Sequence, residues 1–269
     1  MKYFNQYLIL LIFLTISFSS KAQFDEKRYD KESFLIGTLN EYMGYQRTFS
    51  NGDNSLYQRV DIMRQENLKK VLFIDSLFSI NYPDITIVNN GAPLGIKLYS
   101  PTLSLKIDDY YNYKPQLHWT SQGDTTYSGE LKKEKFETEK QKLSFLLGAY
   151  LSYGVDKDIT NLLLKFHEKD NNLDGYENIS VSFSMPNAPT KAQTCVEILK
   201  DLGCNNVEYF VLKEYIPVGY QIIFIPTKKI QKVIDEAVRL REYIETINTD
   251  DVEFTPEGTK FIWDEPKKL

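Results

Sequence analysis

The chain has only two histidines and two cysteines in 269 residues. No apolar run reaches the roughly 18 residues that a transmembrane helix needs. Glycine and proline are also scarce, at 13 and 10 residues, whereas 42% of the residues are apolar. These contents exclude a disordered, collagen-like or disulfide-rich chain and are typical of a globular protein. The sequence motifs of serine hydrolases, zinc proteases, P-loop proteins and dinucleotide-binding proteins are absent as well.

The few reactive side chains do not combine into a catalytic pattern. Cys195 and Cys204 lie on one predicted helix, where a nine-residue separation puts their Cα atoms about 13 Å apart. A disulfide needs less than about 7 Å, so we expect none. Cys195 falls on the apolar helix face and is expected to be a small buried hydrophobic residue. His118 and His167 belong to no recognisable motif, and we assign neither catalytic residues nor a cofactor-binding site.

The first 22 residues have the three parts of a cleavable signal peptide. Lys2 supplies the positive charge, an apolar run follows from Leu8 to Phe18, and Ser20-Lys21-Ala22 offers small residues to a signal peptidase. A permanent membrane anchor is the alternative, but its helix would span only about 18 Å of a core roughly 30 Å thick. We therefore predict export to the periplasm or beyond, with a mature chain that starts at Gln23 and has no transmembrane segment.

Removal of Lys2 and Lys21 takes the formal net charge from −5 to −7. The acidic balance and the lack of a basic block disfavour a nucleic-acid partner, because phosphates attract faces rich in lysine and arginine. The expected partner is instead an unidentified protein, peptide or glycan of the cell envelope.

The C-terminal half gives the clearest fold pattern. A strand with alternating apolar residues, a helix ended by Gly203, two further strands and a final helix capped by Thr227 form a β-α-β-β-α unit. Its first two strands are expected to be parallel and its last two to form an antiparallel hairpin. Helices over one face of such a mixed sheet predict an α+β fold. The elements of this unit are expected at 179–185, 191–202, 207–213, 220–225 and from 228 onward.

The preceding part is expected to combine helices with a small antiparallel meander. The predicted helices are 29–45, 56–79, 131–153 (ending at Gly154) and 158–169, and the predicted strands are 85–88, 95–99, 103–107 and 116–120. The resulting organisation is a signal peptide at 1–22, a helical and β-meander region at 23–130, an α+β region at 131–250 and a polar tail at 251–269.

One pentapeptide occurs twice in predicted helices, as Ser33-Phe34-Leu35-Ile36-Gly37 and Ser144-Phe145-Leu146-Leu147-Gly148. A tyrosine-containing segment and a second glycine, Gly44 or Gly154, follow each copy. We interpret the mid-helix glycines as positions where another element packs closely, since glycine otherwise costs a helix about 1 kcal/mol. The alternative is a duplicated element that frames one functional site.

The strongest motif is Asp170-Asn171-Asn172-Leu173-Asp174-Gly175-Tyr176, which resembles the first half of an EF-hand calcium loop. Asp170, Asn172 and Asp174 would supply side-chain oxygens, and Tyr176 would supply its carbonyl oxygen. The rest departs from that pattern, because Val181 stands where the bidentate glutamate belongs and a strand follows in place of a helix. The alternative is an ordinary turn rich in aspartate and asparagine.

Aromatic and acidic residues also gather in the predicted meander. A recognition patch for sugars or peptides is one interpretation, and cross-strand ring pairs that stabilise a small sheet are the other. The cluster comprises Asp108, Asp109, Tyr110, Tyr111, Asn112, Tyr113, His118, Trp119 and Tyr127.

From these features we expect an exported, soluble cell-envelope protein with a binding or structural role. The alternative is a hydrolase that acts on envelope or extracellular polymers, and the sequence leaves open whether the protein is an enzyme.

The calcium hypothesis predicts that millimolar Ca²⁺ raises the thermal unfolding midpoint of the wild-type protein, because a ligand that binds only the folded state stabilises it. Asp170→Ala should abolish the rise, as measured by differential scanning calorimetry with Mg²⁺ as the control ion. An unchanged midpoint, or an equal rise in both proteins, would exclude this site.

Overall fold

The computed structural model describes residues 24–41, 44–49, 58–89, 95–115, 125–155, 181–214, 216–249 and 252. The predicted signal peptide, the helix at 158–169, the strand at 116–120 and the Asp170–Tyr176 loop lie outside these residues. The described elements are α2 (Lys31–Thr38), β1 (Tyr45–Phe49), β2 (Arg59–Met63), η2 (Gln65–Asn67), α3 (Leu68–Phe78), β3 (Thr86–Asn89), β4 (Ile96–Tyr99), α4 (Pro101–Asp108), β5 (Tyr111–Pro115), β6 (Thr125–Leu131), η3 (Lys133–Lys135), α5 (Glu139–Tyr153), β7 (Gly154–Val155), β8 (Ser182–Pro186), α7 (Pro189–Asp201), β9 (Asn205–Leu212), β10 (Gly219–Ile225) and α8 (Lys228–Glu245).

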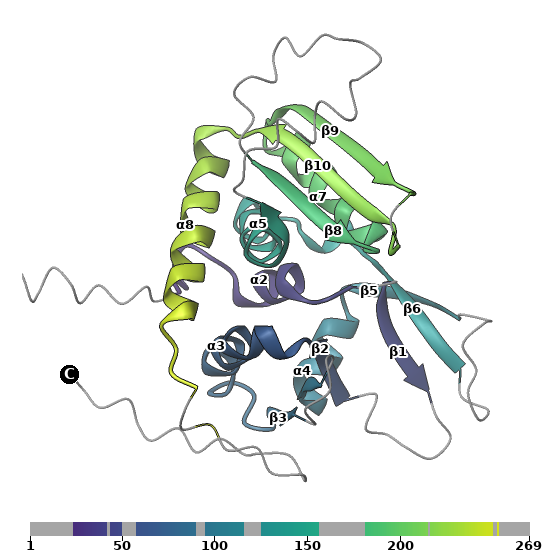
Figure 1. The fold of residues 1–269 in the computed structure, drawn as a ribbon, viewed down its shortest axis with the longest axis vertical. Helices are drawn as coiled ribbons and strands as arrows, with labels where there is room; N and C mark the ends of the chain where they lie inside the picture. The colour runs from purple at the N-terminus through teal and green to yellow at the C-terminus, as the bar shows by residue number, and fades with distance from the viewer. Residues whose placement is uncertain are drawn as a thin grey trace, which may run out of the picture.

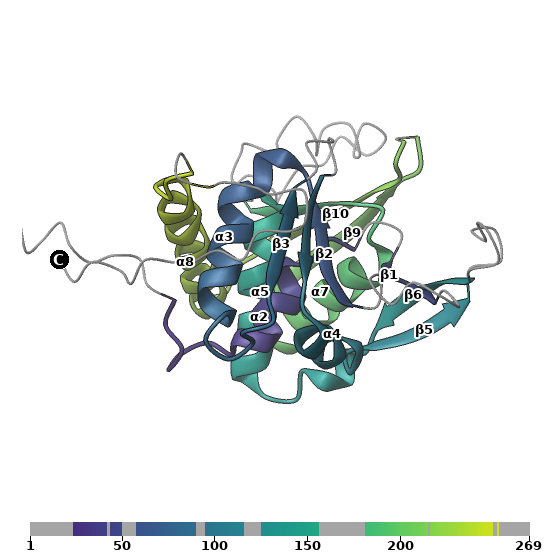
Figure 2. The same ribbon diagram turned by 90° about the horizontal axis from the view of Figure 1, so that it is seen from below.

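The described elements form two repeats with the same order. The first repeat runs α2-β1-β2-α3-β3-β4-α4 and the second runs α5-β7-β8-α7-β9-β10-α8, with the β5–β6 hairpin between them. The sheet order β2-β4-β3 of the first repeat corresponds to β8-β10-β9 of the second. Figure 1 shows α2 and α5 in the middle of the molecule, between these two sheets. Figure 2 shows α3 beside α8, where Phe73 and Tyr243 pack edge to face.

The repeats differ at their first strand. β7 pairs with β8 in its own repeat, whereas β1 pairs with β6 of the inserted hairpin and forms a separate sheet of order β1-β6-β5. This third sheet projects from the side of the molecule in both views. By the repeat pattern β1 would pair with β2, as β7 pairs with β8. It pairs instead with β6 of the inserted hairpin.

Helices and antiparallel sheets place the protein in the α+β class, as the sequence predicted. The β-α-β-β-α order of the second repeat is confirmed, with Thr227 capping α8 and Gly203 in the left-handed region (φ +81°) after α7. β8 and β9 run parallel to each other, as expected, because β10 lies between them and pairs antiparallel with both. The expected antiparallel hairpin of β9 and β10 is also confirmed. The connection between β9 and β10 is short, so the hairpin forms locally and places β10 next to β9.

Two upstream predictions are wrong in type. The expected strand at 103–107 is the helix α4, because Ser100 caps its first turn, Pro101 starts it, and Leu103 and Ile107 lie on one buried face. The first part of the expected helix at 56–79 is the strand β2, whose Val60 and Met63 are buried. Tertiary pairing with β4 overrides the local helical spacing in that segment.

Two helix boundaries are also corrected. The expected helix at 29–45 ends at Thr38 and is followed by β1, and the expected helix at 131–153 begins only at Glu139. Thr138 and Gln141 form a capping box that fixes this start, while the predicted end at Gly154 is confirmed.

Both cysteines are free and buried, as predicted. Cys195 lies on α7, whereas Cys204 lies beyond the end of that helix. Burial raises the pKa of the Cys195 thiol, so the side chain behaves as a small hydrophobic residue and not as a nucleophile.

The duplicated pentapeptide is the contact between the repeats. A Cβ atom at Gly37 would clash with the Phe145 carbonyl oxygen and lie 2.7 Å from the Ala149 nitrogen. A Cβ atom at Gly148 would clash with the Phe34 carbonyl oxygen and lie 2.9 Å from the Thr38 nitrogen. The two contacts are reciprocal, as at a two-fold axis. The packing interpretation of the two glycines is therefore confirmed.

Gly148→Ala should lower the free energy of unfolding by about 3 kcal/mol, because the added methyl group meets backbone atoms that cannot rotate away. Gly203→Ala is the matched control. Its Cβ would meet no neighbour within 4 Å, so only the positive φ angle opposes the change, at about 1 kcal/mol. Urea unfolding of the three proteins tests this order, and equal losses would refute the close-packing argument.

Candidate functional site

The described residues form a pocket where the two repeats meet, with a volume of about 530 Å³. We call it the inter-repeat pocket. The first repeat supplies most of its wall, and the second contributes two prolines. The lining residues are Asn40, Gly44, Tyr45, Gln46, Arg59, Val60, Asp61, Ile62, Arg64, Pro186 and Pro217.

The elements around the pocket are held by a buried arginine from β1. The Arg47 guanidinium donates to Asp108 Oδ1 at 2.8 Å, to the Ser104 carbonyl at 3.1 Å and to the Arg59 carbonyl. It also lies 4.7 Å from the ring centroid of Tyr45. Arg47 thus fixes β1, β2 and α4 relative to one another and sets the position of Arg59 in the pocket wall.

Two arginines give the pocket positive charge. Toward the described residues, the Arg59 guanidinium makes one long hydrogen bond, 3.5 Å from its Nη2 to the Gln46 carbonyl. Arg64 has 68% of its side chain exposed and lies 3.8 Å from Glu66. A guanidinium has five N–H donors, so these contacts leave donors on both side chains for a ligand.

Asp61 forms the acidic part of the wall. Its carboxyl accepts backbone hydrogen bonds from Asn40 at 3.0 Å and from Ile62 at 2.8 Å. Burial raises the pKa of Asp61 to about 6, against these hydrogen bonds and the charges of Lys70 and Lys191. Burial in turn lowers the pKa of Lys70 to about 8, although the charge of Asp61 opposes this. The carboxyl of Asp61 therefore changes its charge close to physiological pH.

A buried lysine stabilises the end of α2 behind the pocket. Lys191 Nζ donates to the carbonyls of Ile36, Gly37 and Leu39 at 2.8, 2.9 and 2.6 Å, which uses all three of its hydrogens. It also lies 3.3 Å from Glu41 Oε1, and both side chains are fully buried. A cation at a helix C-terminus is favoured by the helix dipole.

The end of α5 is satisfied in a comparable way. Arg241 of α8 donates to the carbonyls of Tyr150, Leu151 and Gly154. Ser152 Oγ and the Tyr153 hydroxyl donate to the Thr38 and Leu39 carbonyls, each at 2.9 Å. The C-terminal ends of the two central helices therefore meet next to the pocket. Buried Lys191 and partly buried Arg241, from the outer helices α7 and α8, hold them there.

The described members of the aromatic cluster serve packing. Tyr110 and Tyr111 are buried, and the Tyr111 ring stacks on Tyr45 with 4.7 Å between centroids. The Tyr111 hydroxyl donates to Glu41. Asp108 is paired with Arg47. The structure thus favours the ring-pair interpretation for this part of the cluster, and His118 and Trp119 lie outside the described residues.

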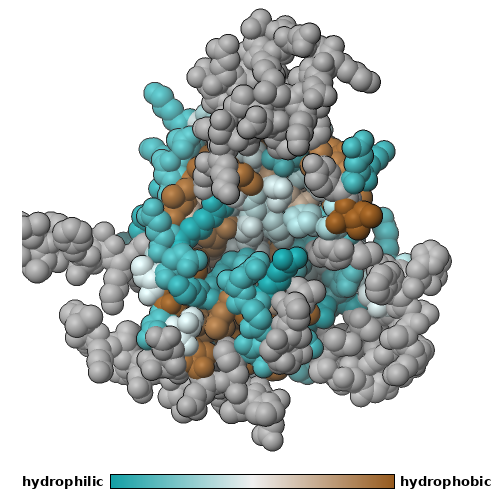
Figure 3. Space-filling model, viewed as in Figure 1, coloured by the Kyte–Doolittle hydropathy of each residue, from teal (hydrophilic) through white to brown (hydrophobic). Residues whose placement is uncertain are grey.

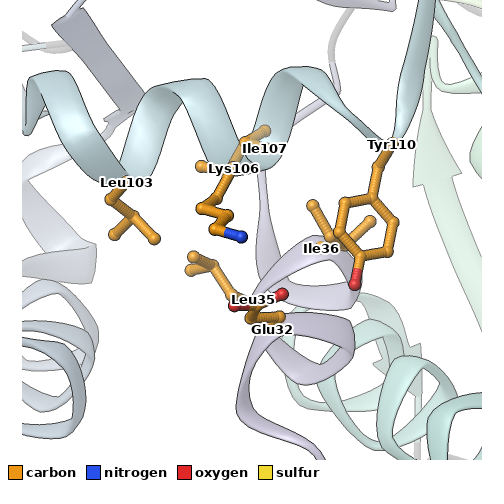
Figure 4. A pocket seen from close by; sticks show the side chains of 7 residues that line it. All are labelled: Glu32, Leu35, Ile36, Leu103, Lys106, Ile107 and Tyr110. Carbon is orange, nitrogen blue, oxygen red and sulfur yellow. The ribbon is translucent and has the colours of Figure 1, made fainter. Parts of the chain in front are cut away.

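The hollow between α2 and α4 has no room for a ligand. Figure 4 shows side chains of α4 and α2 closing a hollow beside Tyr110, and the space left among them does not admit a water molecule.

Within the described ranges, no group of three or more histidine, cysteine, aspartate or glutamate side chains is placed to hold a metal ion. The four residues of the predicted calcium loop, and His167 beside it, lie outside those ranges. No helix among the described residues is long and apolar enough to cross a bilayer.

Comparison with known proteins identifies no family for this chain. Neither a protein-family model nor a curated protein matches the chain. A solved structure that does match is a variant of the homing endonuclease I-DmoI in complex with its target DNA, nicked in the coding strand. It is 14% identical, has a TM-score of 0.40, and the match covers 80% of this chain and 94% of that one.

This comparison contradicts two expectations from the sequence, and both are withdrawn. One is the cell-envelope protein with a binding or structural role, together with its alternative of an envelope hydrolase; the other is the absence of a nucleic-acid partner. A net charge averages over the whole surface and does not describe local regions, so it does not decide whether the protein has a nucleic-acid partner. At this TM-score, nothing that the endonuclease binds is carried over to this chain.

None of the polar residues that line the inter-repeat pocket was predicted from the sequence as a site residue. Asn40 lies three residues after the first copy of the duplicated pentapeptide, which was the available signal. No sequence pattern marks Asp61, Lys70 or Lys191 as a site residue. Each occurs singly in an ordinary segment and acquires its partners only in the fold.

Asp61 should make the protein less stable as the pH rises. Its pKa is about 6 in the folded state and has its ordinary value of 3.8 in the unfolded state, so the folded state binds more protons between these values. From about pH 5 to about pH 7 this residue should remove about 1 kcal/mol of stability. Urea unfolding at several pH values measures this loss, and Asp61→Asn should abolish the contribution of this residue to the slope of the unfolding free energy against pH.

Asp84→Asn is the control for the pH experiment. Although burial opposes it, hydrogen bonds from Thr102 and Ser100 lower the pKa of Asp84, so it stays ionised above about pH 5. Asp84→Asn should therefore leave the slope of the unfolding free energy against pH unchanged between about pH 5 and about pH 7. If the wild type and Asp61→Asn had equal slopes, Asp61 would not titrate as described.

Proposed function

We propose that the protein binds a small organic anion in the inter-repeat pocket. The observation that carries the proposal is the combination of two arginines, Arg59 and Arg64, with apolar walls in one pocket of about 530 Å³. That volume lies within the range of small-molecule sites in proteins.

The pocket offers different chemistry on its different sides. Arg59 and Arg64 retain N–H donors that match a carboxylate, sulfonate or phosphate group. Val60 and Ile62 from β2 face the same space as Pro186 and Pro217 from the second repeat, which suits an apolar or planar body. A ligand with a charged end and an apolar body would use both parts.

The buried surroundings favour binding without large rearrangement. Arg47 holds the backbone of Arg59, and the reciprocal contact of α2 and α5 fixes the two repeats against each other. A preorganised site spends less of its binding free energy on ordering the protein. Protonation of Asp61 removes a negative charge from the wall, so affinity for an anion should rise as the pH falls through about 6.

The proposal predicts that organic anions bind and that their neutral analogues do not. The experiment is ligand-detected NMR with aromatic carboxylates, naphthalene sulfonates and nucleoside monophosphates, each beside its amide, alcohol or nucleoside counterpart. The double variant Arg59→Gln/Arg64→Gln should weaken binding about tenfold or more, because it removes charge-assisted hydrogen bonds.

Arg239→Gln is the matched control for this experiment. Arg239 is a partly exposed arginine of α8 that pairs with Glu236 outside the pocket. Its substitution should leave the affinity unchanged. The proposal fails if no anion binds the wild type, or if the pocket variant and the control variant lose affinity equally.

A further inference from the structure

A second hollow gathers positive charge on an otherwise acidic protein. Its volume is about 570 Å³, and six cationic side chains line it with one acidic residue, Glu139. We call it the basic hollow. The cations are Lys27, Arg28, Lys140, Lys228, Lys229 and Lys232. They come from the N-terminal segment and from the first turns of α5 and α8, which pack against each other along one side of the molecule (Figure 1).

Few of these charges are neutralised by the part of the chain that the structure describes. Lys229 pairs with Glu139 at 2.6 Å, and Lys140 donates to a backbone carbonyl, that of Glu26. The carboxyl of Glu26 is itself paired with Lys31 outside the hollow. Within the described ranges, Lys27, Lys228 and Lys232 have no ion pair, and all three are exposed.

The arrangement opposes the stability of the helices that carry it. Cations are disfavoured at a helix N-terminus, yet the first turn of α8 contains two lysines and no acidic residue. Lys228 and Lys232 are also one turn apart on α8, where like charges repel. Lys229 and Lys140 each make a described contact, but Lys27, Lys228 and Lys232 make no ion pair within the described ranges. A ligand that supplies the missing negative charge would explain why these three cations gather there.

We infer that the basic hollow binds a ligand with several phosphate groups. Tetrahedral phosphates carry dense negative charge, and lysine acts on them as a compact point charge. Free oligophosphate and the backbone of a single nucleic-acid strand share this chemistry. The inference goes beyond the proposed function, because the basic hollow shares no lining residue with the inter-repeat pocket.

The hydropathy of the surface agrees with an aqueous, charged ligand. Figure 3 shows hydrophilic residues over much of the visible face along α8, with hydrophobic residues only in small separate areas. Among the described residues that line the basic hollow, Leu143 is the only apolar one.

The experiment uses the full chain with two probes, inorganic tripolyphosphate and a single-stranded oligothymidylate of about ten nucleotides. Binding is measured by calorimetry and by fluorescence anisotropy, over a range of salt concentrations that starts near 50 mM. Lys228→Gln/Lys232→Gln should weaken binding about tenfold or more. For the oligothymidylate it should reduce the slope of log K against log salt by about 1.4, since each phosphate contact to a single strand contributes about 0.7.

Two controls separate the possible outcomes. Lys135→Gln/Lys213→Gln replaces two exposed lysines elsewhere and should leave binding unchanged. Arg59→Gln/Arg64→Gln should also leave it unchanged, which distinguishes this inference from the proposed function. The lysine variant should melt at or above the wild-type temperature, because it removes repulsion.

Binding of either probe that is lost only in Lys228→Gln/Lys232→Gln supports the inference, and the tighter probe identifies the source of the phosphates. The inference is overturned if neither probe binds, or if the two lysine variants lose affinity equally.

Discussion

The structure depends on the close approach of α2 and α5 at Gly37 and Gly148. Each glycine lies against the backbone of the opposite helix, and the two contacts are reciprocal. The contact joins the two repeats and brings the C-terminal ends of both helices together in the interior. Any side chain at either glycine would separate the helices and, with them, the two sheets that pack on either side.

The meeting of two helix ends inside a protein creates an electrostatic problem. The last carbonyls of each helix have no partners within the helix, and an unpaired buried carbonyl is costly. Lys191 and Arg241 solve it from α7 and α8 by donating to three carbonyls each. Glu41 and Asp61 then balance buried positive charge, so the polar cluster beside the inter-repeat pocket follows from the helix contact itself.

The distribution of charge separates two parts of the surface. The chain as a whole is acidic, yet cations gather in the basic hollow at the N-terminal ends of α5 and α8. The inter-repeat pocket lies beside the opposite, C-terminal ends of the central helices, where Arg59 and Arg64 stand among apolar walls and the partly neutralised Asp61. The two hollows therefore suit different anions, one with an apolar body and one with dense charge.

The sequence by itself determined the α+β class, the β-α-β-β-α order of the second repeat, the free cysteines and the importance of the two mid-helix glycines. These features rest on local signals such as apolar periodicity, helix caps and turn residues. Only the tertiary structure decided that β2 is a strand, that β10 lies between β8 and β9, and that Lys191 and Glu41 form a buried ion pair. Strand pairing and buried charges depend on contacts between residues far apart in the chain, and no local pattern encodes them.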